Sequence, residues 1–215
     1  MKKHLINAVF TLNLLFLGFP SLLAQNQFPS EFWYQGRIYG TDGQTHTGLV
    51  KYDLENNVVQ LKSETISTFT AFNVSNFEIQ NKTNEGMRSF YSLPYSPTGD
   101  ENKTPIFFEV LIEGQEISLL SREYVETNYS STGSKGINGP TNDGHKVKKK
   151  YRLAFDYFFF KDYEIQKYSL LKKDLLDFFP AYQDEINQFM KKNKLDHDKR
   201  RDLISITAYY NELKN

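Results

Sequence analysis

Acidic side chains on predicted strands are the residues of this sequence whose chemistry is easiest to name. Glu109, Glu116, Glu123 and Asp156 stand in segments where apolar and polar residues alternate, a pattern that predicts strands. Two carboxyl groups about 5 to 10 Å apart could serve as acid and as nucleophile or base in glycoside hydrolysis. Charged residues also protect exposed strand edges, so a hydrolase acting on cell-wall or polysaccharide material is one hypothesis among several.

A histidine between two aspartates is the second arrangement that could carry chemistry. His197 stands between Asp196 and Asp198, and these residue types bind metals and transfer protons. The segment separates two helical stripes, where an aspartate caps a helix and suits the positive end of its dipole. His46 and His145 stand in no ligand-spaced motif. We therefore expect both aspartates to cap a helix, and we predict no metal and no cofactor.

Aromatic residues are more abundant candidates than catalytic groups. Phe32, Trp33 and Tyr34 stand together at the start of the predicted strand region, and Tyr157 begins a run of four aromatic residues. On a surface such rings would bind a sugar, a peptide or a partner chain, whereas inside the domain they would fill the core. We predict these four residues as ligand-binding candidates, with core packing as the alternative. The chain has no nucleophile elbow, no zinc-protease helix, no phosphate-binding glycine loop and no cysteine.

The first 24 residues have the layout of a secretory signal peptide. Lys2 and Lys3 precede an apolar run from Leu5 to Phe19, and Ala24 is a suitable cleavage residue. Retention as a membrane anchor is the alternative, but polar residues and a proline interrupt the run. We therefore predict export to the periplasm, the cell surface or the medium, with no transmembrane segment after cleavage.

The overall charge of the chain argues against nucleic acid as a partner. Cleavage after Ala24 would leave 24 basic and 26 acidic residues, so no global charge draws the protein to nucleic acid. A local basic patch, Lys146, Lys148, Lys149, Lys150 and Arg152, could contact an anionic polymer or simply be solvated.

The sequence predicts strands followed by helices as the elements that carry these residues. Period-two patterns with regular turn signals predict an antiparallel β-rich domain over residues 25–165, and Glu113-Gly114 is predicted as a two-residue hairpin turn. Residues 128–150 are rich in Ser, Gly, Asn and Lys and predict a mobile loop. Helical spacing from residue 166 to 215 predicts two or three helices packed on the β body. The predicted fold class is α+β, with a sheet like an open barrel or a sandwich followed by C-terminal helices.

The strand segments also carry a resemblance. The run GRIYGTDGQTHTGLVKYDLENNVVQLK, followed by AFNVSNFEI, RSFYSLP and FFEVLIEGQEISLLSRE, covers Gly36 to Glu123. It resembles the layout of uncharacterised exported β-rich proteins of Gram-negative bacteria. The resemblance implies residence in the cell envelope and a β-rich body, and it brings no activity or site residue.

Together these features favour a non-catalytic exported protein whose partner is another envelope protein, a peptide or a glycan. The hydrolase described above is the first alternative. The second alternative is that the helical tail docks on a partner while the β body holds it.

Overall fold

The computed structural model describes residues 28–80, 86–131 and 147–214 of the chain. The predicted signal peptide and residues 132–146 of the predicted loop lie outside this part. The described residues form a ten-stranded antiparallel sheet followed by three helices, which confirms the predicted fold class. The strands are β1 (Tyr34–Gly40), β2 (Thr45–Asp53), β3 (Val58–Lys62), β4 (Ile66–Thr70), β5 (Val74–Gln80), β6 (Met87–Tyr95), β7 (Thr104–Ile112), β8 (Ser118–Ser131), β9 (Val147–Lys161) and β10 (Glu164–Lys167).

The sheet is open, and its N-terminal half curls over itself. The strand order is β10-β9-β8-β7-β6-β5-β1-β2-β3-β4, so β4 and β10 are the two edges. The turn between β2 and β3 reaches β7, where the Phe107 backbone N–H donates to Asn57 Oδ1 at 3.1 Å. Tyr52 packs inside this curl against the rings of Phe77, Phe90 and Phe107. Burial of these alternating rings explains why the first seven strands bend around one core.

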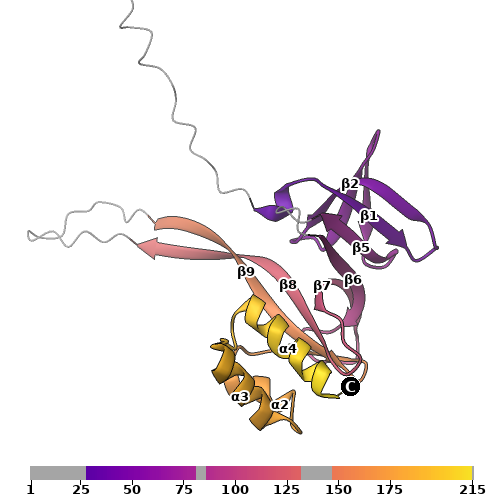
Figure 1. The fold of residues 1–215 in the computed structure, drawn as a ribbon. Helices are drawn as coiled ribbons and strands as arrows, with labels where there is room; N and C mark the ends of the chain where they lie inside the picture. Colours follow the sequence, from indigo (N-terminus) through magenta and orange to yellow (C-terminus); the bar gives the residue numbers. More distant parts are fainter. Residues whose placement is uncertain (1–27, 81–85, 132–146, 215) are drawn as a thin grey trace, which may run out of the picture.

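Strands β7 and β8 separate part of the way along. Their pairing ends at Glu109 and Ser121, although β8 continues to Ser131 beside β9. Beyond this point β8 and β9 form a two-stranded ribbon that leaves the sheet, as Figure 1 shows. We call the place where β7 and β8 separate the fork. The side chain of Asn57 occupies the β7 side of the fork.

Helices cover the other half of the sheet. They are α2 (Lys172–Asp177), α3 (Gln183–Asn193) and α4 (Arg200–Lys214), preceded far upstream by the short 3-10 helix η2 (Pro29–Glu31). Their apolar stripes pack on β8 and β9 in one buried cluster that contains Leu119, Phe159, Ile186 and Tyr210. Figure 1 shows α4 lying along β8 and β9, with α2 and α3 outside it. None of the described helices is long and apolar enough to span a bilayer.

Several local expectations differ from the structure. The predicted two-residue turn at Glu113-Gly114 is longer, because β7 ends at Ile112 and β8 begins at Ser118. Asn211 of α4 packs so close to Gly114 that a Cβ there would lie 2.1 Å from its amide nitrogen. The ends of the predicted loop are strand residues, because β8 runs to Ser131 and β9 starts at Val147.

The predicted capping of a helix by Asp196 and Asp198 does not occur among the hydrogen bonds of the described residues. The carboxylate of Asp202 accepts from the backbone N–H of Asp196 at 2.9 Å, whereas no side-chain cap by Asp196 or Asp198 is seen. His197 lies beside Tyr168, whose hydroxyl is 3.3 Å from His197 Nδ1 and donates to the His197 carbonyl at 3.1 Å. The Asp-His-Asp segment is therefore a connection between α3 and α4 that is held by Tyr168.

Candidate functional site

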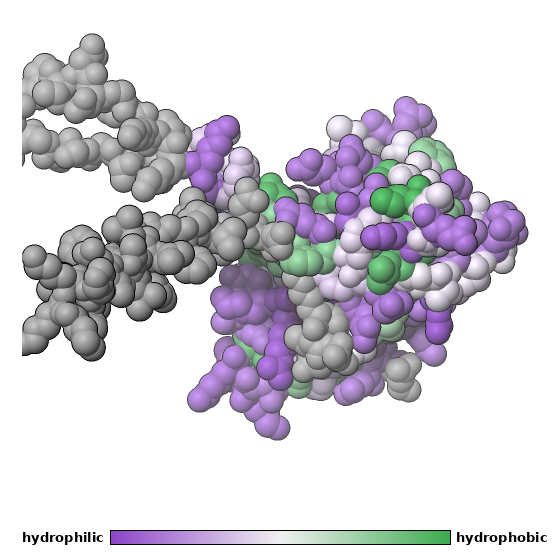
Figure 2. Space-filling model, turned by 90° about the horizontal axis from the view of Figure 1, so that it is seen from above, coloured by the Kyte–Doolittle hydropathy of each residue, from purple (hydrophilic) through white to green (hydrophobic). Residues whose placement is uncertain are grey.

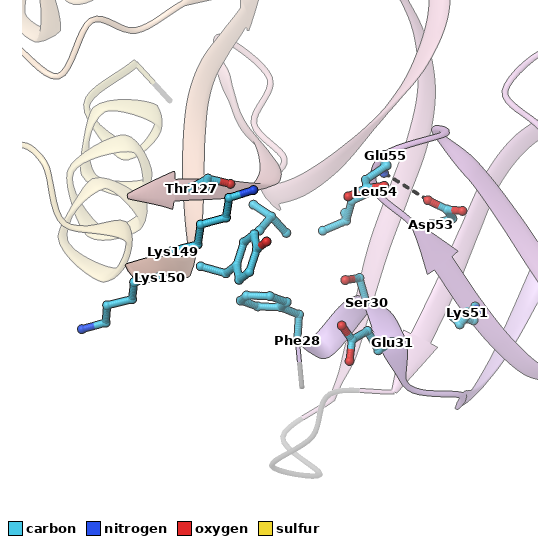
Figure 3. A pocket seen from close by; sticks show the side chains of 12 residues that line it. Phe28, Ser30, Glu31, Lys51, Asp53, Leu54, Glu55, Thr127, Lys149 and Lys150 are labelled. Atoms are coloured by element: carbon cyan, nitrogen blue, oxygen red, sulfur yellow. Dashed lines mark hydrogen bonds between the residues drawn. The ribbon is translucent and has the colours of Figure 1, made fainter. Parts of the chain in front are cut away.

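A cleft of about 760 Å³ lies between the ribbon and the curled half of the sheet. One wall comes from the η2 segment and from the end of β2 with the turn that follows it. The other wall comes from β8 and β9, where they have left the sheet (Figure 3). In the space-filling view, apolar side chains reach the surface where the ribbon meets the curled half, whereas the rest of this face is polar apart from isolated residues (Figure 2). The cleft therefore lies in the space that opens where β8 and β9 separate from β7.

The wall on the curled half is acidic and locally rigid. Glu31, Asp53, Leu54 and Glu55 line it together with Lys51. Asp53 Oδ1 accepts from the backbone N–H groups of Glu55 and Asn56, each at 3.1 Å, so the side chain closes its own turn. Burial opposes ionisation of Asp53, but the bonds from Asn56 and Glu55 and the nearby ammonium of Lys51 hold its pKa below the ordinary value. Asp53 therefore stays negatively charged at a lower pH than an ordinary aspartate does.

The wall on the ribbon is apolar and basic. Val125, Thr127 and Tyr151 line it, with Lys149 and Lys150 beside them. Thr127 and Tyr151 are opposite each other in the β8–β9 register, so strand alternation turns both to the same face. The Tyr151 side chain is 49% exposed. Phe28 lines the opposite wall (Figure 3), so the cleft offers aromatic surface as well as two charged walls.

The inner end of the cleft narrows to a cavity of about 10 Å³. Ser30 belongs to both hollows, and Tyr34, Tyr52, Arg88 and Glu123 line the smaller one. A cavity of this size has room for about one water molecule. Burial raises the pKa of Tyr52 to about 12, so its hydroxyl stays protonated at neutral pH. Ile79 and Phe90 line this cavity as well, so the cleft ends at a narrow floor of mixed polar and apolar side chains.

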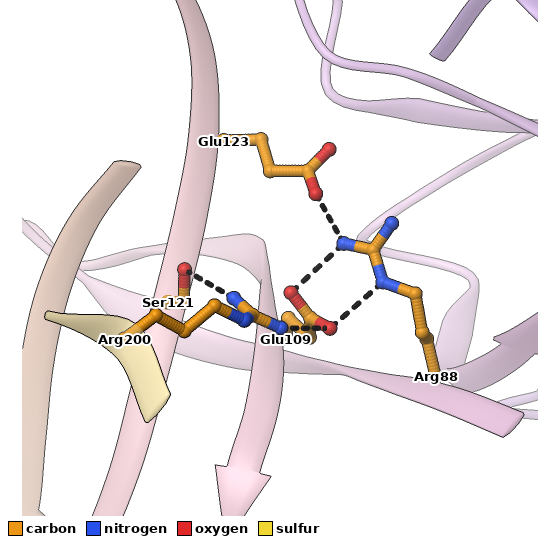
Figure 4. A network of polar contacts seen from close by, with 5 residues as sticks. All are labelled: Arg88, Glu109, Ser121, Glu123 and Arg200. Carbon is orange, nitrogen blue, oxygen red and sulfur yellow. Dashed lines mark hydrogen bonds and ion pairs between the residues drawn. The ribbon is translucent and has the colours of Figure 1, made fainter. Parts of the chain in front are cut away.

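Behind this floor, two arginines and two glutamates form a buried network at the fork (Figure 4). Glu109 of β7 accepts from Arg88 Nε and Nη2, each at 2.8 Å, and from Arg200 Nη2 of α4 at 2.7 Å. Glu123 of β8 accepts from the same Arg88 Nη2. Arg200 also donates to the Ser121 hydroxyl at 3.4 Å. The network joins β6, β7, β8 and α4 at the point where the ribbon separates.

The two glutamates respond in opposite ways to this environment. Burial would raise the pKa of Glu109, but the guanidinium groups of Arg88 and Arg200 hold it below the ordinary value. Burial raises the pKa of Glu123, and the charge of Glu109 raises it further against the opposing effect of Arg88. Carboxyl groups with separated pKa values can act as an acid and base pair. The side chains of Glu109 and Glu123 are only 4% and 7% exposed, however, so a substrate could not reach them in this conformation.

The predicted carboxylates are brought together only in part. Glu109 and Glu123 meet at Arg88, as described above. Glu116 pairs with Lys214 at 3.3 Å, and Asp156 pairs with Lys167 at 2.8 Å, so each has a separate partner. Among the described residues, no group of three or more His, Cys, Asp and Glu could hold a metal ion.

None of the four predicted aromatic residues lines the larger part of the cleft. Tyr34 lines the inner cavity, and the ring of Trp33 lies 5.3 Å from Lys51 Nζ of the acidic wall. Phe32 precedes them and is half-buried. Tyr157 is 5% exposed and packs beneath the helices, so it does not line the cleft. Its role as a ligand residue has no support in this position.

Several cleft residues had no signal in the sequence. Phe28, Asp53, Glu55 and Tyr151 come from segments far apart in the chain, and no motif connects them. Lys149 and Lys150 belong to the basic patch seen in the sequence. That patch indicated local positive charge, but it did not indicate that acidic residues would lie across a cleft from it. The two walls of the cleft face each other because β7 and β8 stop pairing at Glu109 and Ser121, and this end of the pairing has no sequence motif.

Comparisons of the chain with family models, with curated proteins and with solved structures gave no match. The geometry of the cleft is therefore the basis for a functional proposal.

Proposed function

We propose that this chain is an exported, non-catalytic binding protein of the bacterial cell envelope, and that the cleft between the ribbon and the curled half holds an extended peptide or glycan. The observation that carries the proposal is the cleft itself, about 760 Å³ with an aromatic interior and two charged walls. Ligand sites typically occupy about 300 to 1,000 Å³ and combine apolar surface with a few polar groups. The signal-like residues 1–24 support export.

Hydrolysis is the second candidate, and the pairing of Glu109 with Glu123 is what favours it. Both carboxylates bond to Arg88, and their pKa values are moved apart. The geometry supports this candidate less well, since both groups are buried and only Glu123 reaches a cavity, which has room for about one water molecule. A hydrolase would need the floor of the cleft to open.

The proposal is tested with the chain from Gln25 to Asn215 on a glycan array and against a random linear nonapeptide library. Each ligand retained by the wild-type protein is then titrated against Tyr151→Ala, which removes the aromatic ring from the cleft. Tyr163→Ala is the matched control, since this tyrosine is 93% exposed at the β9–β10 turn and does not line the cleft.

We expect at least one ligand that binds about tenfold more weakly to Tyr151→Ala and unchanged to Tyr163→Ala, because loss of a contacting ring costs about 1 to 2 kcal/mol. Recovery of every ligand intact after prolonged incubation would agree with binding without turnover. A protein that retains no ligand, or only ligands that are indifferent to Tyr151, would refute the proposal. Cleavage of a retained glycan that stops in Glu123→Gln would favour the hydrolase.

A further inference from the structure

Strand β8 has a free edge along the cleft. It pairs with β9 from Ser118 to Ser131, but it pairs with β7 only as far as Ser121. Within the described residues, no strand pairs with the β7-facing edge of Arg122–Ser131, and no turn or loop backbone hydrogen bond reaches it. Ten residues at about 3.4 Å each give an open edge of roughly 34 Å.

A free edge of this kind recognises one type of ligand. Every second residue directs its N–H and C=O away from β9, so the edge presents a regular row of donors and acceptors. An extended polypeptide carries a matching row at the same spacing, and strand addition satisfies both. A glycan carries hydroxyl groups but has no such backbone row. The edge therefore distinguishes between the two ligand classes that the cleft could hold.

The free edge borders the cleft. Val125 and Thr127 of β8 line it, and Leu54 and Glu55 of the β2–β3 turn lie on the opposite wall. The turn reaches β7 at this opening, where the Phe107 N–H donates to Asn57 on the β7 side. A strand added to β8 would thus lie between the ribbon and this turn, in the space where β7 would have continued beside β8.

The charges of the two walls specify the side chains of such a strand. Glu31, Asp53 and Glu55 stand on the wall of the curled half, and Lys149 and Lys150 stand on the ribbon. Side chains of a strand alternate between its two faces, so one peptide can direct basic groups to one wall and acidic groups to the other. Phe28 and Tyr151 add aromatic surface for an apolar side chain between them.

We propose that the ligand of the cleft is an extended peptide segment with charges of both signs, which adds to the free edge of β8 as a further strand. The inference rests on the proposed function, which leaves a peptide and a glycan open as ligands, and it selects the peptide. It assigns the β8 backbone where it borders the cleft, around Val125 and Thr127, as the main recognition element and the charged walls as the source of specificity.

The test uses the peptides selected from the nonapeptide library on the wild-type chain. The strongest is resynthesised with N-methyl groups at alternate residues, once in the odd frame and once in the even frame. N-methylation removes the N–H donors from one edge of the peptide only. We expect one frame to weaken binding at least tenfold and the other to change it less than threefold, because only one edge faces β8.

Each alternative outcome has its own signature. A protein that binds neither peptides nor glycans refutes the proposed function and this inference together. A glycan that binds in a Tyr151-dependent way, without any peptide, leaves the proposed function intact and overturns the inference. A selected peptide that tolerates both N-methyl frames, or that binds Tyr151→Ala as well as wild type, also overturns it. Sedimentation of the free chain as a dimer, with the β8 amides already protected from hydrogen exchange, would assign the edge to a second copy instead.

Discussion

Replacement of Glu109 by glutamine leaves two arginines at the fork without their shared carboxylate. Glu109 accepts three charged hydrogen bonds, at 2.8, 2.8 and 2.7 Å, from Arg88 and Arg200. Its side chain is 4% exposed and that of Arg88 is 18% exposed, so water cannot fully replace the lost partner. The amide of glutamine is similar in shape but places a donor against at least one guanidinium N–H.

The magnitude follows from the burial of the partners. Loss of one partner from a buried ion pair costs about 3 to 5 kcal/mol, because the remaining charge is left uncompensated. Arg200 is 33% exposed and regains part of its hydration, and Arg88 keeps Glu123, so we expect about 3 kcal/mol. Equilibrium unfolding in urea at pH 7 measures this loss. Glu116→Gln is the control, since its pair with Lys214 is exposed and should contribute less than about 1 kcal/mol.

The pH dependence of the folding stability tests the same prediction independently. The pKa of Glu109 is lowered in the folded protein, so its stabilising effect is present above the ordinary value of 4.5 and is lost as pH falls through the folded pKa. The difference between wild type and Glu109→Gln should therefore shrink on acidification below pH 4.5. A variant that loses less than about 1 kcal/mol at pH 7, or a difference that grows in acid, would refute the structural role of the network.

Two further predictions concern the same fork and the helices. Burial raises the pKa of Glu123, so the stability associated with its protonated form is present at low pH and is lost as pH rises through the folded pKa. Glu123→Gln should therefore gain stability relative to wild type as pH rises above 4.5, and urea unfolding that shows the opposite trend would contradict this. Deletion of Ala181–Asn215 should give an aggregating protein, because Ile186, Ile206 and Tyr210 are at most 2% exposed and cover Leu119 and Phe159. A soluble monomer with an intact β-sheet spectrum would instead favour a helical tail that docks on a partner.

The order of strands and helices was predictable because local patterns determine it. Alternation identified the strands from Tyr34 to Ser121, and the change to helical spacing after residue 166 identified the segment that covers Leu119 and Phe159. Long-range geometry was not predictable in this way. Where β7 separates from β8, the Phe107 N–H donates to Asn57, fifty positions away in the chain, and no periodicity records that contact.

The residues of the candidate site could likewise be predicted only in part from local sequence patterns. Glu109 and Glu123 were singled out as carboxylates that could meet, and they do meet at Arg88. Their arginine partners could not be foreseen, because Arg88 and Arg200 come from a different strand and from the last helix. Tyr157 shows the limit of reasoning from residue type, since an aromatic strand residue suits a surface and a core equally well until a helix covers it.

Amide hydrogen exchange of the wild-type chain, with and without a saturating selected peptide, shows where the peptide binds. Strand addition to β8 predicts at least tenfold slower exchange of the edge-facing amides of Tyr124–Ser131 and of the turn at Asp53–Glu55, with α3 (Gln183–Asn193) unchanged. Protection confined to the helices or to the edge strand β4, with the amides of β8 unaffected, would place the ligand elsewhere and refute strand addition in the cleft.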